Sequence, residues 1–338
     1  MSEGLVGSEL VDVERLGAWL DGCGLEVGLP ITVAPLTSGR SNAMFSVHRG
    51  ASRWVLRRPA AVAIERADEG MRREYQILDA LTGSKVPHPE TVALCEDHDV
   101  LGCTFFLMQQ VDGVNPAPPL PDPFTVADQP GVAFAMVDAL AALHDFDWRQ
   151  GSLSDFGKPD GFHERQVERW TTQLASYNGR ELPGLDRVTK FLSENLPGSF
   201  EPSLMHGDFH MFNALISSEP PGKVAAIIDW ETATIGDPLL DLIGFCEIWG
   251  KATVGPGWPR RTELIARYRE QRDLELPSDL SYYEVLYNFR MAVLLEGIYQ
   301  RSLHDATRPD LVDVGAGAMG FHERALDVLD QRGEVQFG

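Results

Sequence analysis

Several features that would assign this 338-residue chain to a special class are scarce in its sequence. Cysteine occurs only four times and never as a closely spaced pair, so neither a disulfide framework nor a structural zinc site is expected. Lysine and arginine total 29 against 50 acidic residues, a formal charge of −21. Nucleic acids and anionic membranes require basic patches, so this balance argues against both as partners. A nucleotide is still compatible, because a few local cations suffice for its phosphates.

From the sequence we expect neither an export signal nor a membrane-spanning segment. The first residues contain neither the basic nor the apolar region of a signal peptide. The longest apolar helical segment, residues 279–302, carries Glu284, Arg290 and Glu296, which argues against a membrane span. Hydrophobic residues make up 43% of the chain, enough for a sizeable core. We therefore expect a cytoplasmic globular protein with a small-molecule substrate.

The most informative stretch is Met205–Asn213, MHGDFHMFN, followed by a short apolar run at Val224–Ile228. The apolar run predicts a buried strand that ends at Asp229. In this pattern Asp208 suits the removal of a proton from an attacking hydroxyl, while Asn213 and Asp229 suit Mg²⁺ bound to a nucleotide triphosphate. The sequence thus predicts Asp208 as the catalytic residue and Asn213 and Asp229 as metal ligands.

This ordered set of Asp208, Asn213, Asp229 and Gly236-Asp237-Pro238 resembles the aminoglycoside phosphotransferase and choline kinase superfamily. Within it, the resemblance is to the branch found alone in bacteria or fused to acyl-CoA dehydrogenases. It covers about residues 28 to 330 and implies an α+β, two-lobed, protein-kinase-like fold. Residues 1–111 would form a nucleotide-binding lobe with an antiparallel sheet and a helix, and residues 112–338 a largely helical catalytic and substrate lobe. The implied cofactors are ATP and Mg²⁺, with GTP as an alternative to ATP.

Three strands are predicted near the start, at Ile31–Leu36, Ala43–His48 and Arg53–Arg58. The first two flank a small polar turn with one glycine, which suits a hairpin whose backbone N–H groups cover phosphate. Such turns are common, and the resemblance is what assigns this one to the nucleotide. The implied phosphate-binding residues are Ser38, Gly39, Arg40, Ser41 and Asn42.

The third strand places Arg57 where related kinases carry a phosphate-binding lysine, by alignment of position. The next predicted helix, Ala67–Leu81, carries Glu74 inside an apolar stripe with Met71 and Leu78. A buried carboxylate is costly unless a cation meets it, and Arg57 is the expected partner. The plainer alternative is that Arg57 and its neighbour are exposed strand residues.

Two further strands are predicted at Thr91–Glu96 and Cys103–Val111. The second runs into Asp112-Gly113, where the resemblance implies a hinge that bonds the nucleotide base. The implied hinge residues are Gln109, Gln110 and Val111, with Met108 beside the base.

Several polar residues after the catalytic stretch have simpler explanations. Asp237 and Pro238 predict a helix start, and Asp241 one turn later is expected to bond the catalytic loop. Glu231 is a further candidate carboxylate near the metal. His144 ends an apolar helix and is expected to have a structural role.

Other functions stay open at this level. His206, Asp208 and His210 alternate in a way that also suits a metal-dependent hydrolase, and a nucleotide-binding scaffold without turnover would keep the same fold. For a kinase, the expected acceptor is a hydroxyl of a small molecule, with a hydroxyacyl compound favoured and an aminoglycoside as the alternative. The residues expected to line its site in segment 279–302 form an aromatic, mixed-charge wall, which favours an amphiphilic ligand with an anionic end. They are Tyr282, Tyr283, Glu284, Tyr287, Asn288, Arg290, Glu296 and Tyr299.

Overall fold

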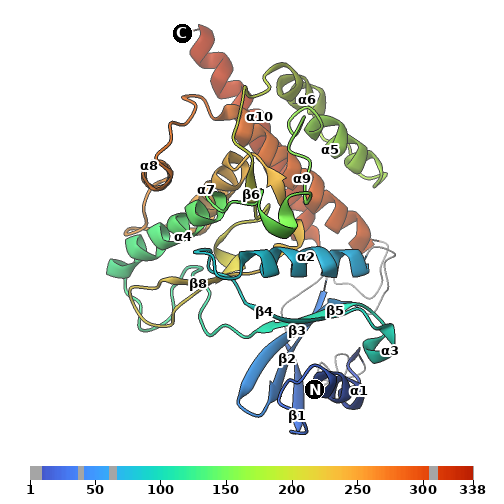
Figure 1. Cartoon of the computed structure of the whole chain (residues 1–338). Coiled ribbons are helices and arrows are strands. Elements are labelled where there is room, and N and C mark those ends of the chain that lie inside the picture. The colour runs from blue at the N-terminus through green and yellow to red at the C-terminus, as the bar shows by residue number, and fades with distance from the viewer. Residues whose placement is uncertain (1–9, 37–41, 61–66, 304–310, 338) are drawn as a thin grey trace. The chain divides into compact units, whose positions relative to one another are not determined.

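The computed structural model describes residues 10–36, 42–60, 67–303 and 311–337 (Figure 1). The chain groups into two compact units. The first comprises Met1–Asp155, Met211–Ala233 and Val254–Pro259, and the second comprises the segments between and after them. This grouping differs from the lobes expected on either side of residue 111, because the first unit also takes in residues beyond that point. The lobe boundary itself stays a prediction.

The first unit is built on a five-stranded antiparallel sheet with the strand order β1-β2-β3-β5-β4. Its strands are β1 (Ile31–Leu36), β2 (Asn42–Arg49), β3 (Ser52–Pro59), β4 (Thr91–Cys95) and β5 (Phe105–Gln109). All five predicted strands are therefore confirmed, with ends that move by one or two residues.

The two faces of this sheet carry different groups because side chains alternate along each strand. Leu56 pairs with Leu107 in the register of β3 and β5, and both are completely buried in a core shared with α1 (Val13–Gly22) and α3 (His98–Leu101). On the opposite face lies α2 (Ala67–Leu81), which crosses the sheet in Figure 1. Arg57 follows Leu56 in β3, and its side chain therefore points to the opposite face, toward α2.

The remainder of the first unit includes α4 (Gln129–His144) and the hairpin of β7 (Ala214–Ile216) and β8 (Val224–Ile227), against which α4 packs. Within the described residues, Val126–His144 is the one helical stretch long and apolar enough to cross a membrane. Core helices of soluble proteins also meet that criterion. His144 at its end is buried, as expected of a packed residue.

The second unit consists mainly of helices. They are α5 (Gln166–Ala175), α6 (Leu185–Glu194), α7 (Leu239–Ala252), α8 (Arg261–Arg272), α9 (Ser281–Leu303) and α10 (Val312–Phe337). Helix α9 is central, since it contacts α5, α6, α7 and α10. A two-stranded ladder of β6 (Ser203–Met205) and β9 (Thr234–Gly236) precedes α7. Sheet and helices together confirm the predicted α+β class.

Candidate active site

A cavity of about 390 Å³ lies in the first unit, a volume within the usual range of small-molecule sites. Its walls come from β2, β3, α2, the end of β5 and the stretch from Phe212 to Glu231. Eight of the residues predicted from sequence to bind nucleotide or metal line it: Asn42, Arg57, Glu74, Gln109, Gln110, Val111, Asn213 and Asp229. Folding therefore gathers into one cavity residues that are up to 187 positions apart in the chain.

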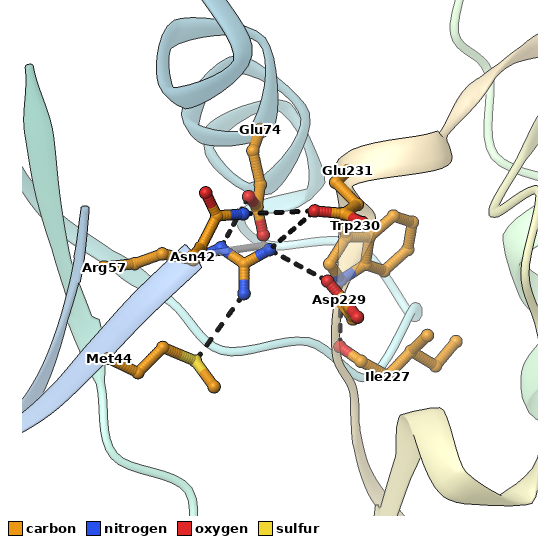
Figure 2. Close-up of polar contacts among 8 residues, drawn as sticks. All are labelled: Asn42, Met44, Arg57, Glu74, Ile227, Asp229, Trp230 and Glu231. Atoms are coloured by element: carbon orange, nitrogen blue, oxygen red, sulfur yellow. Dashed lines mark hydrogen bonds and ion pairs between the residues drawn. The ribbon is translucent and has the colours of Figure 1, made fainter. Parts of the chain in front are cut away.

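Arg57 forms the centre of the charged wall, as Figure 2 shows. Its Nε donates to Glu74 at 2.7 Å, and one terminal nitrogen donates to Asp229 at 2.8 Å. The same nitrogen lies 3.7 Å from Glu231. The predicted contact between Arg57 and Glu74 is confirmed, and the direct contact with Asp229 was not foreseen. The alternative of an exposed strand arginine is wrong, because Arg57 is only 4% exposed.

The charge balance around Arg57 favours protonation of Glu74. Burial raises the pKa of Glu74 to about 7, and the nearby charges of Asp229 and Glu231 add to that rise while Arg57 opposes it. One guanidinium thus serves three carboxylates. The cluster carries excess negative charge, which a divalent cation would neutralise.

Asp229 is placed by an unusual backbone conformation at the end of β8. Its φ is 67°, in the left-handed region that aspartate tolerates better than most residues. The following Trp230 is buried and its indole N–H donates to Ile227 at 2.9 Å, which holds the turn in place (Figure 2). Asn42 then donates to Glu231 at 3.1 Å. These contacts direct carboxylate groups toward Arg57.

The oxygen atoms of this wall fit a hard divalent cation. Asn213, Asp229 and Glu231 offer carboxamide and carboxylate oxygens, the ligands that Mg²⁺ prefers, and all three line the cavity. No donor in this set is a thiolate or an imidazole, the ligands that softer metals favour. The residues present therefore fit Mg²⁺.

The end of β5 forms the more apolar wall. Met108, Val55 and Leu78 line the cavity there, and the chain continues through Gln109 and Gln110. The backbone N–H groups of these two glutamines donate to Glu90 and Arg53. The predicted hinge is therefore held by main-chain bonds beside an apolar surface, an arrangement that suits a planar base.

The predicted catalytic loop around Asp208 lies in the second unit, where Asp241 fixes its backbone. One carboxylate oxygen accepts from the backbone N–H of His206 at 2.7 Å and the other from Gly207 at 2.9 Å. This confirms the expected bond between Asp241 and the loop. Arg290 of α9, which the sequence did not link to this loop, donates to the Gly207 carbonyl. The loop is thus fixed from two helices.

Asp208 itself is prepared to act as an anion. Its carboxylate lies 3.4 Å from the imidazole of His210. Burial works toward a higher pKa, but the hydrogen bond and charge of His210, with the charges of His206 and Arg290, together lower the pKa of Asp208. Asp208 is consequently ionised at neutral pH and able to accept a proton or a hydrogen bond.

Some expectations fall outside the described residues or need correction. Ser38, Gly39, Arg40 and Ser41 lie outside the described residues, so their assignment to phosphate stays a prediction. The proposed aromatic wall on α9 is largely wrong, because most of its members pack inside the second unit. The buried members are Tyr282, Tyr283, Tyr287, Asn288 and Glu296.

The metallohydrolase alternative gains no support from the loop. Among the described residues no group of three histidine, cysteine or acidic side chains is arranged to hold a metal. His206 is completely buried, and its Nδ1 accepts a hydrogen bond from the backbone N–H of Asp208 at 3.3 Å. That nitrogen is already occupied within the loop.

The fold and these residues together define a phosphotransferase. The model of the phosphotransferase enzyme family matches residues 32–275, and the chain belongs to this family. Its fold is the protein-kinase-like fold of aminoglycoside phosphotransferases, as predicted. A solved structure from Ralstonia eutropha, assigned provisionally to the aminoglycoside phosphotransferases, superimposes with a TM-score of 0.83 at 27% identity and covers 95% of this chain and 98% of its own.

Some relatives of this chain are much longer proteins. Acyl-CoA dehydrogenase family member 11 of Homo sapiens is 30% identical over 303 residues, which cover 85% of this chain and 38% of that protein. Acyl-CoA dehydrogenase family member 10 of Mus musculus is 28% identical over 287 residues, which cover 81% of this chain and 27% of that protein. The chain thus spans well under half the length of these relatives.

Proposed function

We propose that this protein transfers the γ-phosphoryl group of ATP to a hydroxyl group of a small acyl-type molecule, with Mg²⁺ as the metal. The observation that carries the proposal is the cavity in which Arg57, Glu74 and Asp229 meet beside Asn213. Two solved aminoglycoside phosphotransferases of this fold, each 20% identical to this chain, hold ADP or AMP-PNP, and this likeness supports the choice of a nucleotide as the phosphate donor.

Each residue of the scheme has one task. Arg57, held by Glu74, binds phosphate oxygens, and the backbone from Gln109 to Val111 positions the base. Asn213 and Asp229 would hold Mg²⁺, which when bound neutralises charge on the phosphates. Asp208, ionised at neutral pH, orients the acceptor hydroxyl and accepts its proton. Phosphoryl transfer of this kind depends mainly on positioning and charge neutralisation.

The choice of a hydroxyacyl acceptor rests on the relatives and on local charge. Two of them carry acyl-CoA dehydrogenase names, which suggests an acyl compound as the shared chemistry. Aminoglycosides are polycations and require clustered carboxylates, whereas the catalytic loop has Arg290 beside it. We further propose a cytoplasmic location.

The direct test is a measurement of ADP release with Mg²⁺ and ATP, or GTP in a parallel series. The acceptors would be a panel of hydroxy acids, hydroxyacyl-CoA thioesters and aminoglycosides of the kanamycin type. We expect turnover with acyl compounds and little with aminoglycosides. Efficient phosphorylation of the aminoglycosides alone would reverse the acceptor assignment, and no turnover with any hydroxyl compound would refute the kinase proposal.

A further inference from the structure

Arg169 and Arg290 of the second unit contact the same aromatic ring, that of Trp170. The guanidinium carbon of Arg169 on α5 lies 4.9 Å from the ring centre of Trp170, and that of Arg290 on α9 lies 5.7 Å from the same centre. The ring is fixed, since Trp170 is 6% exposed and its indole N–H donates to Gln166 at 3.0 Å. Neither arginine forms an ion pair with any carboxylate of the described residues.

This arrangement is electrostatically unfavourable by itself. Arg169 keeps part of its surface in solvent, but its partial desolvation and the positive charges of Arg290 and Arg165 lower its pKa. Arg165 adds a third positive charge, and its own guanidinium donates to the backbone carbonyls of Lys158 and Asp160. In addition, the Nε of Arg290 is buried without a hydrogen-bond partner. An anion placed among these groups would reduce the repulsion between the arginines and would accept a hydrogen bond from the Nε of Arg290.

The position of the pair connects it to the reaction. Arg290 donates to the carbonyl of Gly207, the residue directly before Asp208. Its charge also contributes to the ionised state of Asp208. The cations are therefore close to the carboxylate that, in the proposed function, receives the acceptor hydroxyl.

We propose that Arg169 and Arg290 form a subsite for an anionic group of the acceptor, a carboxylate or a phosphate of the molecule whose hydroxyl is phosphorylated. A guanidinium presents paired N–H donors that match either group. The identification of the anion as part of the acceptor rests on the proposed function, whereas the binding of an anion by the two arginines does not. It selects against cationic acceptors through repulsion.

The test is calorimetric binding to the full chain with ADP and Mg²⁺ present. The probes are hydroxybutyrate as a carboxylate, coenzyme A as a phosphate, and neutral butanediol as a control. We expect the wild-type protein to bind at least one anionic probe more tightly than butanediol. Arg169→Gln should weaken that binding by roughly tenfold or more, since it removes charge-assisted hydrogen bonds, and Arg169→Lys by less.

The matched control is Arg187→Gln, which removes an exposed arginine of α6 that pairs with Asp330 in the same unit. Its anion affinity should equal that of the wild type. Loss confined to hydroxybutyrate identifies a carboxylate subsite, and loss confined to coenzyme A identifies a phosphate subsite. Equal affinities in the wild type and Arg169→Gln, or no binding of either anion to the wild type, would overturn the subsite.

A kinetic measurement separates this inference from the proposed function. With an anionic acceptor that is turned over, Arg169→Gln should raise KM and leave kcat nearly unchanged, because the hydrogen bond to the loop before Asp208 comes from Arg290, which this variant retains. If no acceptor is turned over and anion binding still depends on Arg169, the proposed function fails while the subsite stands.

Discussion

Among single residues, Asp208 and Asp229 have different surroundings and should fail differently when changed. Asp208 lies in the second unit beside His210, whereas Asp229 pairs with Arg57 in the cavity of the first unit. Asp208→Asn should abolish turnover with little change in nucleotide affinity, because its proposed contact is with the hydroxyl. Asp229→Asn should weaken Mg²⁺-dependent ATP binding as well. Nucleotide titration with and without Mg²⁺ distinguishes them, and a fully active Asp208→Asn variant would refute its assignment.

The buried pair of Arg57 and Glu74 should show strong coupling. Both side chains are almost fully buried, and removal of one partner leaves the other charge poorly compensated, at a cost of about 3–5 kcal/mol. In a double-mutant cycle on ATP affinity, measured above pH 7 with Arg57→Met and Glu74→Gln, the two losses should overlap. The exposed pair of Arg72 and Glu96 on the same unit is a matched control, expected to couple by less than about 1 kcal/mol. Additive losses at Arg57 and Glu74 would contradict the pairing.

The raised pKa of Glu74 also predicts a pH dependence of stability. Because it is raised from 4.5 to about 7, the folded protein binds more protons than the unfolded chain within that interval. The contribution of Glu74 to the free energy of unfolding therefore falls as the pH rises through this window. Relative to Glu74→Gln, the wild type should lose about 3 kcal/mol between pH ~5 and pH ~8 in urea denaturation. If the difference in the free energy of unfolding between the wild type and Glu74→Gln is the same at both pH values, Glu74 has an ordinary pKa in the folded protein.

At the level of elements, helix α7 holds the catalytic loop through Asp241 in its first turn. Asp241→Ala leaves the buried N–H groups of His206 and Gly207 without acceptors, at about 1–3 kcal/mol each. We expect a clear fall in the free energy of unfolding and a larger fall in kcat than in nucleotide affinity. Asp186→Ala is the control, since this aspartate lies in the first turn of α6 and is exposed. Equal effects of the two substitutions would show that Asp241 does not hold the loop.

The element pattern explains why some boundaries could be predicted. Helix α2 spans the predicted Ala67–Leu81 and β1 the predicted Ile31–Leu36, because an apolar stripe or alternation marks each along its length. Helix α5 begins only at Gln166, and residues 161–165 before it form turns. There His163 bonds Asp237 at 3.0 Å, and this contact between distant residues has no local signature.

For the whole molecule, burial separates the four thiols into two classes. Cys23 is exposed, while Cys95, Cys103 and Cys246 are buried. Burial raises the pKa of the Cys246 thiol to about 12, which further suppresses its thiolate form. A thiol reagent at neutral pH should label Cys23 rapidly and the other three only as fast as the protein opens. Rapid labelling of all four without denaturant would contradict this packing, and Cys23→Ser should remove the fast phase.

The sequence alone determined the family resemblance, the α+β class and eight of the residues that line the cavity. These features depend on local spacing: the interval from Asp208 to Asn213, the strand before Asp229, and a carboxylate inside an apolar stripe at Glu74. Such patterns are set by the geometry of one element or one loop. They can therefore be recognised in the sequence without a structure.

Only the tertiary structure decided which charges meet. Arg57 reaches Asp229, 172 residues away, because alternation on β3 turns it toward α2 and a left-handed turn brings the carboxylate back. The same holds for Arg169 and Arg290, which lie on α5 and α9 and meet over Trp170. The packing of distant elements sets such contacts, and a one-dimensional pattern carries no record of that packing.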